Sequence, residues 1–356
     1  MSWSVAIGGA TGNVGAEMVR TLEARDFPIG RFVPLASERS VGAGATVQFR
    51  GESYPVEDIA AHDFAQTDIL FLSTGGDNAR VVCPRAADAG CTVIDNSSAF
   101  RMDPDVALVV PEVNGHLLDG TNLALGHVFP VANCSTIQLA LVLHALRGLA
   151  PLRRVVVSTY QSASGGGRAM LNRLLSPLDP VGLDMRALMA SAQRALAESG
   201  PKPIAFNVVP HIDIFLEDGR TKEEWKMEVE TRRILDLPDL PVAVTCARVP
   251  VLVGHSEAVA VEFDAPVEVE AARAALAEHP GIAVLDRREE GGYATPLETA
   301  GTDDVWVSRL RADRTVPSGL LLWIVADNVR KGAALNAVQI AERLVANPSA
   351  TPRTWP

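Results

Sequence analysis

The sequence predicts a two-domain α/β protein, with a doubly wound parallel sheet in the first half and a mixed α+β domain in the second. Three observations predict this fold. The chain has 356 residues, enough for two domains of ordinary size. Short apolar runs alternate with helical periods in the first half. In the second half, several apolar runs alternate with polar residues at period two, as in a sheet with one covered face.

Each element of the first domain is predicted from a short segment. We expect strands at 4–10, 31–37, 68–74, 91–97 and 107–113, and helices at 13–26 and 78–90. Strands that alternate with helices imply right-handed crossovers and a parallel sheet covered on both faces. Pro34 lies inside the second strand, which indicates an edge or a strand end at that point.

The second domain has more strands and longer helices. We expect strands at 153–162, 205–212, 242–251, 256–264 and 304–313, and helices at 168–176, 183–198, 221–235 and 268–278. A long amphipathic helix is expected at 326–346, where it would complete the first domain. The predicted boundaries are therefore 1–133, with 326–346, for the first domain and 134–325 for the second.

Composition excludes several classes of function. The net charge of −11 argues against a nucleic-acid surface, which needs clustered Lys and Arg. No apolar run approaches the roughly 18 residues that span a bilayer, and the N-terminus lacks the basic segment of a signal peptide. The four cysteines show no CxxC pairing, which suits a reducing compartment and argues against structural zinc. We expect a cytoplasmic protein with no metal and no membrane partner.

A glycine loop lies between the first strand and the first helix. Gly9, Gly12 and Gly15 would allow a tight turn, close approach of a pyrophosphate and close helix–strand packing. The helix N-terminus would then face the phosphates. The spacing is GxxGxxG, so a glycine-rich turn without a ligand is the alternative. The segment STGG (73–76) is either a second close-approach loop or a simple turn.

The end of the second strand should decide which dinucleotide binds. It reads Ser37, Glu38, Arg39, Ser40. An acidic residue at this place usually binds the ribose hydroxyls of NAD, whereas an arginine accommodates the 2′-phosphate of NADP. Arg39 between two serines offers a bidentate cation and two hydroxyls, which favours NADP. Glu38 keeps NAD open.

Cys134 is the candidate nucleophile. It stands in NCSTIQ (133–138), directly before an apolar run that reads as a helix, while Pro130 disfavours helix upstream. A helix N-terminus favours negative charge, so the thiol pKa there can fall well below about 8.5. A free cysteine more often packs as a small apolar side chain, which fits Cys83, Cys91 and Cys246, all set in apolar segments.

A thiolate nucleophile needs an acid/base partner, usually histidine. Of the seven histidines, His255 lies where two strands meet at Gly254, and His211 lies near a strand end. The residues alone leave both open. Two arginines could bind anions. Arg101 follows a strand, at the edge where open α/β sheets bind ligands, and Arg248 lies in an apolar strand, where a lone charge must find a partner.

Taken together, these segments resemble the bacterial aspartate-semialdehyde dehydrogenase family. The resemblance covers nearly the whole chain in order, and NCSTIQ and RVPVLVGH (248–255) are its most specific parts. The other segments that carry it are GATGNVG (9–15), SERS (37–40), DNSSAFR (95–101), VPEVN (110–114), YQSASGGG (160–167), EEWKMEVET (223–231) and DNVRKGAALNAVQ (327–339).

The resemblance implies a Rossmann domain, a catalytic domain of the glyceraldehyde-3-phosphate-dehydrogenase type, and a homodimer. The reaction that it implies is the NADPH-dependent reductive dephosphorylation of L-4-aspartyl phosphate. This reaction would serve the biosynthesis of lysine, threonine, methionine and diaminopimelate. It implies that Cys134 is the nucleophile, that Gln161 orients the acyl-thioester and that His255 is the acid/base. It assigns the substrate to Arg248 and Glu223, and the phosphate to Arg101, Asn133 and Lys226. It assigns the cofactor to Gly9, Thr11, Gly12, Asn13, Val14, Ser37, Arg39, Ser40, Ser164, Gly165 and Asn328.

Periodicity alone reads the helix that carries Glu223 and Lys226 as a solvated charged face. Two other functions remain open at this point. A reductase of another acyl phosphate, such as N-acetylglutamyl phosphate, would share the loop, the cysteine and the histidine. A non-catalytic dinucleotide-binding protein could use the same fold. Glu38 departs from the family, in which a small residue usually stands between that serine and arginine.

Overall fold

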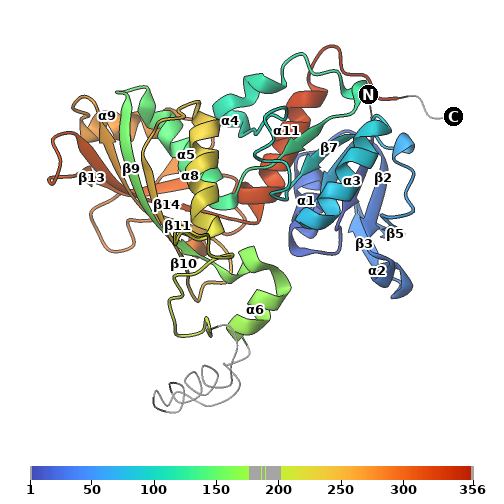
Figure 1. Cartoon of the computed structure of the whole chain (residues 1–356), viewed down its shortest axis with the longest axis horizontal. Coiled ribbons are helices and arrows are strands. Elements are labelled where there is room, and N and C mark those ends of the chain that lie inside the picture. The colour runs from blue at the N-terminus through green and yellow to red at the C-terminus, as the bar shows by residue number, and fades with distance from the viewer. Residues whose placement is uncertain (1, 176–185, 187–188, 190–201, 354–356) are drawn as a thin grey trace. The chain divides into compact units, whose positions relative to one another are not determined.

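A computed structural model describes residues 2–175, 186, 189 and 202–353 of the chain (Figure 1). Internal contacts divide the chain into two compact units. Unit 1 comprises Met1–Ile137, Arg233–Leu235 and Arg330–Pro356, and unit 2 comprises Gln138–Arg232 and Asp236–Val329. The division falls inside helix α5 (Cys134–Arg147), whereas the sequence analysis set the boundary before that helix.

Unit 1 is built on a six-stranded sheet of order β5-β2-β1-β6-β7-β8, in which every pairing is parallel. Its strands are β1 (Trp3–Gly8), β2 (Ile29–Ala36), β5 (Glu57–Asp58), β6 (Ile69–Leu72), β7 (Thr92–Asp95) and β8 (Val128–Pro130). Every residue of β1, β6 and β7 is buried, as expected of central parallel strands. Unit 1 thus has the predicted doubly wound sheet.

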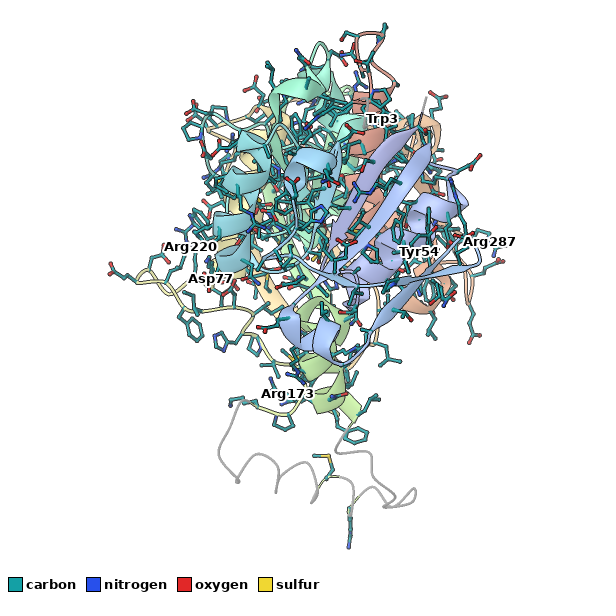
Figure 2. The ribbon with its side chains drawn as sticks, turned by 90° about the vertical axis from the view of Figure 1, so that its right-hand side faces the viewer. Trp3, Tyr54, Asp77, Arg173, Arg220 and Arg287 are labelled. Atoms are coloured by element: carbon teal, nitrogen blue, oxygen red, sulfur yellow. The ribbon has the colours of Figure 1, made fainter. Side chains whose placement is uncertain are left out.

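Helices and short elements cover this sheet. The helices are α1 (Asn13–Ala24), α2 (Glu38–Gly42), α3 (Gly76–Asp88), α4 (Pro111–Asn114) and α11 (Leu335–Val345), with 3-10 turns η1 (Phe64–Gln66), η2 (Gly115–Leu118) and η3 (Leu123–Leu125). A hairpin of β3 (Thr46–Phe49) and β4 (Glu52–Pro55) carries Tyr54 (Figure 2). The ring of Tyr54 packs with Phe32 of β2. Apolar side chains of α3 form one core cluster with those of β1, β2, β6 and β7.

One prediction for unit 1 needs correction. The segment 107–113 is no strand, because only Val109 forms an isolated bridge, to Val131, and α4 begins at Pro111. Proline is favoured at the first turn of a helix and lacks the N–H that a ladder needs, so it ends the pairing here. The other proline, Pro34, pairs with Ile7 of β1, and the two-residue strand β5 reaches only Leu35 and Ala36 beside it.

Unit 2 is built on a six-stranded mixed sheet of order β10-β9-β11-β14-β13-β12. Its strands are β9 (Leu152–Gln161), β10 (Val242–Arg248), β11 (His255–Phe263), β12 (Ile282–Val284), β13 (Val305–Ala312) and β14 (Gly319–Ala326). Its other elements are α6 (Gly167–Leu175), α8 (Lys222–Leu235), α9 (Val269–Glu278), α10 (Pro296–Thr299) and η4 (Ala163–Gly166). Along β11, buried residues alternate with partly exposed ones, which is the predicted one-sided pattern.

Several predictions for the second half also need correction. The segment 205–212 is no strand, since only Val209 forms a bridge, to Arg248. Strands β12 and β14 were not predicted; β14 is apolar almost throughout (GLLLWIVA) and has no alternation to mark it. The expected helix at 326–346 starts later, with a π-helix at Arg330–Ala334 that leads into α11. The helix expected at 183–198 lies outside the described residues, apart from 186 and 189.

Within the described part of the chain, no helix has both the length and the apolar character needed to cross a bilayer. Over the same residues, no group of three or more His, Cys, Asp or Glu side chains could hold a metal ion.

Candidate active site

In unit 1, the candidate nucleophile Cys134 is the first residue of α5. Asn133 caps this helix, because its Oδ1 accepts hydrogen bonds from the backbone N–H groups of Ser135 (3.0 Å) and Thr136 (3.2 Å). The predicted placement at a helix N-terminus is confirmed. Cys134 is partly exposed, whereas the other three cysteines are buried and burial raises the pKa of each of their thiols. Cys134 is thus the only cysteine with both access and a favourable helix end.

The π-helix that precedes α11 packs directly on Cys134. A Cβ on Gly332 would lie 2.7 Å from the Cβ of Cys134, which is too close for any side chain. The neighbouring Lys331 is fully buried, and its Nζ bonds to Glu112 and, at 3.2 Å, to Gln339. Burial would raise the pKa of Glu112, but the contact with Lys331 lowers it overall, so the Glu112 carboxylate stays ionised. This buried ion pair anchors the backbone that touches the nucleophile.

Arg101 is held close to the start of α5 by two backbone carbonyls. Its Nε donates to the carbonyl of Val131 at 2.8 Å, and its Nη2 donates to the carbonyl of Asn96 at 3.1 Å. The carbonyl of Arg101 itself accepts a hydrogen bond from Arg233 Nη1. The guanidinium is buried, so a charge is fixed in unit 1 near the chain segment that leads to Cys134.

The glycine loop of unit 1 fits its predicted use. A Cβ on Gly9, whose φ is +81°, would lie 2.4 Å from the carbonyl oxygen of Ser73, and a Cβ on Gly15 would lie 2.2 Å from the carbonyl oxygen of Gly9. The loop therefore packs against segment 73–76, and α1 packs against the loop. Gly12 stands at the N-cap of α1, which has no side-chain cap. The first N–H groups of a helix lack acceptors within the helix, so this end of α1 is suited to hold a phosphate.

The polar segment at the end of β2 is open. Ser37, Glu38 and Arg39 are exposed, and the hydroxyls of Ser37 and Ser40 lie 3.4 Å apart. Among the residues that the structure describes, the side chains of Glu38 and Arg39 have no hydrogen-bond or ion-pair partner. The segment thus presents one cation, one anion and two hydroxyls beside the strand end where a ribose is expected.

In unit 2, sheet register brings three predicted residues to one edge. Gln161 ends β9, Arg248 ends β10, and the two are paired in the parallel ladder. His255 begins β11, which runs antiparallel to β9, with Ser256 opposite Tyr160. The end of β9, the end of β10 and the start of β11 therefore meet at the same edge of the sheet, and Gln161, Arg248 and His255 are all buried there.

Helix α8 adds a charged pair to this edge. Glu223, buried on α8, accepts a hydrogen bond from Gln161 Nε2 at 3.0 Å and one from Lys226 Nζ at 3.2 Å. Lys226 Nζ also bonds to Asp213 at 2.6 Å. Burial alone would lower the pKa of Lys226, but Glu223 and Asp213 raise it overall, so the ammonium stays charged. The solvated face suggested by periodicity is therefore wrong for Glu223.

Arg248 and His255 are both buried, and the charge of Arg248 acts on the imidazole of His255. Arg248 Nη1 donates to the carbonyl of Ser162 at 2.6 Å, and the side chain lines a cavity of about 790 Å³ in unit 2. Burial, followed by the charge of Arg248, lowers the pKa of His255 to about 3, against smaller opposing effects of Glu223 and the Gly254 carbonyl. His255 is neutral at pH 7. The alternative histidine, His211, is exposed and stacks on Phe215 with ring centroids 4.2 Å apart.

Ser164 and Asn328, two residues assigned to the cofactor by resemblance, form a buried hydrogen-bonded cluster in unit 2. Asn328 Oδ1 accepts hydrogen bonds from Gly254 N–H (2.8 Å), Ser162 Oγ (3.0 Å) and Ser164 Oγ (3.1 Å). A Cβ on Gly165 would lie 3.3 Å from His255 Nε2 and 3.2 Å from Arg248 Nη1. The loop after β9 therefore lies over the imidazole and the guanidinium.

Sequence reasoning missed three residues that contact the site: Ser162, Lys331 and Gly332. A signal existed for one of them, because Lys331 falls on the apolar face of the amphipathic 326–346 segment, where a charge needs a buried partner. The backbone N–H of Ser162 contacts His255 Nδ1, and sequence patterns do not reveal a backbone contact of this kind. Position 332 requires a glycine only because Cys134 lies against it, which is a contact in the folded chain.

One unit has a glycine loop and a capped helix that begins with a cysteine, and the other has a mixed sheet with a buried histidine. Together these features are typical of nucleotide-dependent dehydrogenases. Family models agree in detail: the semialdehyde dehydrogenase NAD-binding domain matches residues 4–121, and the semialdehyde dehydrogenase dimerisation domain matches residues 143–331. The chain is thus a semialdehyde dehydrogenase, with a nicotinamide-dinucleotide-binding domain and a dimerisation domain.

Comparison with individual relatives shows which kind of semialdehyde dehydrogenase the chain resembles. The chain is 44% identical to the aspartate-semialdehyde dehydrogenase of Aquifex aeolicus, over 97% of this chain and 98% of that protein. It is 43% identical to that of Legionella pneumophila, over 96% and 95%. The crystal structure of aspartate semialdehyde dehydrogenase II from Vibrio cholerae, complexed with ASA, superposes with a TM-score of 0.87 at 39% identity, over 98% and 99% of the two chains. The chain belongs to the aspartate-semialdehyde dehydrogenase family of oxidoreductases.

Proposed function

We propose that this protein catalyses the NADPH-dependent reductive dephosphorylation of L-4-aspartyl phosphate to L-aspartate 4-semialdehyde and phosphate. The observation that carries this proposal is that a cation, Arg248, and an anion, Glu223, both neighbour Gln161 at one edge of the unit 2 sheet. Arg248 suits the α-carboxylate of a free amino acid, and Glu223 suits its ammonium group. An N-acetylated substrate has no ammonium for Glu223 to bind. The Vibrio cholerae relative, which was crystallised with ASA, supports the same substrate.

We further propose a covalent mechanism. The Cys134 thiolate attacks the acyl phosphate carbon, and phosphate leaves with its charge held by Arg101, Asn133 and Lys226. Gln161 orients the resulting thioester, and His255 acts at the reacting oxygen as the acid/base. Backbone N–H groups at the start of α5 are available to stabilise the oxyanion of the tetrahedral intermediate. Its collapse forms the aldehyde and frees the thiolate.

Unit 1 supplies most of the proposed contacts to the dinucleotide, and Ser164, Gly165 and Asn328 of unit 2 supply the others. NADPH, when bound, supplies the hydride that reduces the thioester carbon. The glycine loop and the free end of α1 would hold the pyrophosphate, and Arg39 with Ser37 and Ser40 would hold the 2′-phosphate. The remaining cofactor contacts that we propose are Gly9, Thr11, Gly12, Asn13, Val14, Ser164, Gly165 and Asn328. Glu38, exposed beside Arg39, makes the preference for NADP over NAD less strict.

Other parts of the proposal concern the assembly and the setting. The dimerisation-domain match supports a homodimer formed through residues within 143–331. The domain assignment that we propose is cofactor binding by 1–133 with 326–346, and catalysis and dimerisation by 134–325. The reaction belongs to the biosynthesis of lysine, threonine, methionine and diaminopimelate. The absence of CxxC pairing among the four cysteines suits the cytoplasm.

A phosphate-dependent assay tests the function. We expect the purified protein to reduce NADP with aspartate semialdehyde and phosphate, and we expect omission of phosphate to stop turnover. N-acetylglutamate semialdehyde serves as the competing substrate. Turnover with the acetylated aldehyde alone would assign the enzyme to the other acyl phosphate. NADPH binding without any turnover would assign it to the non-catalytic class.

A further inference from the structure

Asp213 is a carboxylate without an assigned role that bonds to Lys226, the proposed phosphate ligand of unit 2. Its Oδ2 accepts a hydrogen bond from Lys226 Nζ at 2.6 Å, whereas the distance from the same Nζ to Glu223 Oε2 is 3.2 Å. Burial would raise the pKa of Asp213, but its bond to Lys226 lowers it overall, so the group is ionised. Two carboxylates therefore share the one ammonium of Lys226.

A short hairpin brings Asp213 to the first turns of α8. Phe215 pairs with Thr221 in an isolated antiparallel bridge, and α8 begins at the next residue, Lys222. The chain thus folds back on itself soon after Asp213, and Lys226 follows about one turn into the helix. Backbone pairing, and not only the attraction of the two charges, therefore sets the contact between Asp213 and Lys226.

The backbone of Asp213 has an uncommon conformation. Its φ is +70°, in the left-handed region that favours glycine, and its Oδ1 accepts a hydrogen bond from the N–H of Ile214 at 2.9 Å. Such conformations persist where the surrounding structure fixes them, and they cluster at functional sites. Asp213 also lines the cavity of about 790 Å³ that Arg248 lines. The strained residue thus borders the same cavity as the proposed ligand of the substrate carboxylate.

The charges of these side chains suit a substrate that brings its own ammonium group. Asp213 and Glu223, taken with Lys226, carry one negative charge in excess. The ammonium of a bound amino acid would neutralise this excess at Glu223. Without Asp213, Lys226 alone would neutralise Glu223. A substrate ammonium would then add an uncompensated charge where the side chains of Glu223 and Lys226 are mostly buried, which is costly.

We propose that Asp213 is a positioning residue that supplies the counter-charge of Lys226, so that the carboxylate of Glu223 stays available to the substrate ammonium. This inference rests on the proposed function and deepens it. The same contact weakens the attraction of Lys226 for phosphate, because a phosphate anion meets a cation whose charge Asp213 partly offsets. Asp213 therefore acts on the two ligands in opposite senses: it favours the ammonium of the aldehyde substrate and disfavours phosphate.

Steady-state kinetics of Asp213→Asn in the full-length protein tests the proposal. Asparagine keeps the size of the side chain and tolerates a left-handed backbone, so the main change is the lost charge. In NADP reduction with aspartate semialdehyde and phosphate, we expect KM for the aldehyde to rise about three- to fivefold and KM for phosphate to fall by a similar factor. The control Asp218→Asn, on the same hairpin and in an exposed pair with Arg220, should change neither KM. A structural defect would not move the two KM values in opposite directions.

Succinate semialdehyde, which differs from aspartate semialdehyde only in lacking the amino group, isolates the contribution of the ammonium. The preference for aspartate semialdehyde is the ratio of the two kcat/KM values. We expect this preference to fall about three- to fivefold in Asp213→Asn and to keep its wild-type value in Asp218→Asn.

Unchanged KM values, shifts of both KM values in the same direction, or an unchanged preference in Asp213→Asn would overturn the inference. A variant that no longer binds NADPH would overturn it as well, because Asp213 would then be a residue needed for folding. Failure of the wild-type protein to turn over aspartate semialdehyde would instead contradict the proposed function.

Discussion

The burial of a neutral His255 should make unit 2 sensitive to mild acid. Burial and Arg248 lower the pKa of this residue to about 3 in the folded protein, whereas the ordinary value is 6.5. Between these two values the unfolded chain binds a proton that the folded chain does not. The stabilisation is therefore complete above about pH 6.5 and is lost as the pH falls toward about 3.

The size of the effect follows from the two pKa values. At about pH 5 the unfolded residue is almost fully protonated and the folded residue is neutral, which costs roughly 2 kcal/mol relative to about pH 7. In His255→Asn the titrating group is gone. We therefore expect the loss of unfolding free energy between these two pH values to be about 2 kcal/mol smaller in His255→Asn than in the wild type.

Urea unfolding followed by tryptophan fluorescence measures this difference, because three of the five tryptophans, Trp225, Trp306 and Trp323, lie in unit 2. The matched control is His211→Asn, which removes an exposed histidine of the same unit and should keep the wild-type pH dependence. An equal pH dependence in His255→Asn and the wild type would refute the reasoning, since it would mean that His255 titrates normally in the folded state.

Three further predictions follow from the site. Arg39→Ala should weaken NADPH binding roughly 10–100-fold and leave NADH binding nearly unchanged, as measured by fluorescence titration. The control Arg20→Ala, on α1, should change neither affinity. An unchanged ratio of NADPH affinity to NADH affinity in Arg39→Ala would show that another group selects the cofactor. Glu223→Gln should raise KM for aspartate semialdehyde about tenfold or more, because the substrate ammonium loses its counter-charge. The control Glu262→Gln, in a partly exposed ion pair with Arg154, should leave KM unchanged. Equal KM values in Glu223→Gln and the wild type would show that Glu223 does not bind the substrate. Gly332→Ala should slow alkylation of the Cys134 thiol by iodoacetamide and lower kcat, because the added Cβ meets Cys134 at 2.7 Å. A wild-type alkylation rate would contradict this packing.

The sequence predicted those elements whose signals are local. The helix start at Cys134 followed from Pro130, Asn133 and an apolar run, and the structure places α5 there. Strand β14 was missed because it is apolar without alternation, and periodicity does not separate such a run from a buried helix. The segment 107–113 was wrongly predicted as a strand because its apolar run resembles one, whereas a helix begins at Pro111.

The site was harder to predict because its residues come from separate strands. Residue chemistry alone left His211 and His255 open. Sheet register distinguishes them, because it brings His255 to the edge shared by Gln161 and Arg248 and leaves His211 stacked on Phe215. His255 Nδ1 contacts the backbone N–H of Ser162, and no pattern of side chains encodes this contact.

The measurement that tests the central claim most directly is the mass of the protein after mixing with aspartate semialdehyde and NADP in the absence of phosphate. We predict a burst of about one NADPH per active site and a matching aspartyl thioester, which peptide mapping places on Cys134 and which phosphate then releases. A protein that forms no adduct, carries it on another residue, or turns over continuously without phosphate would contradict a thioester on Cys134.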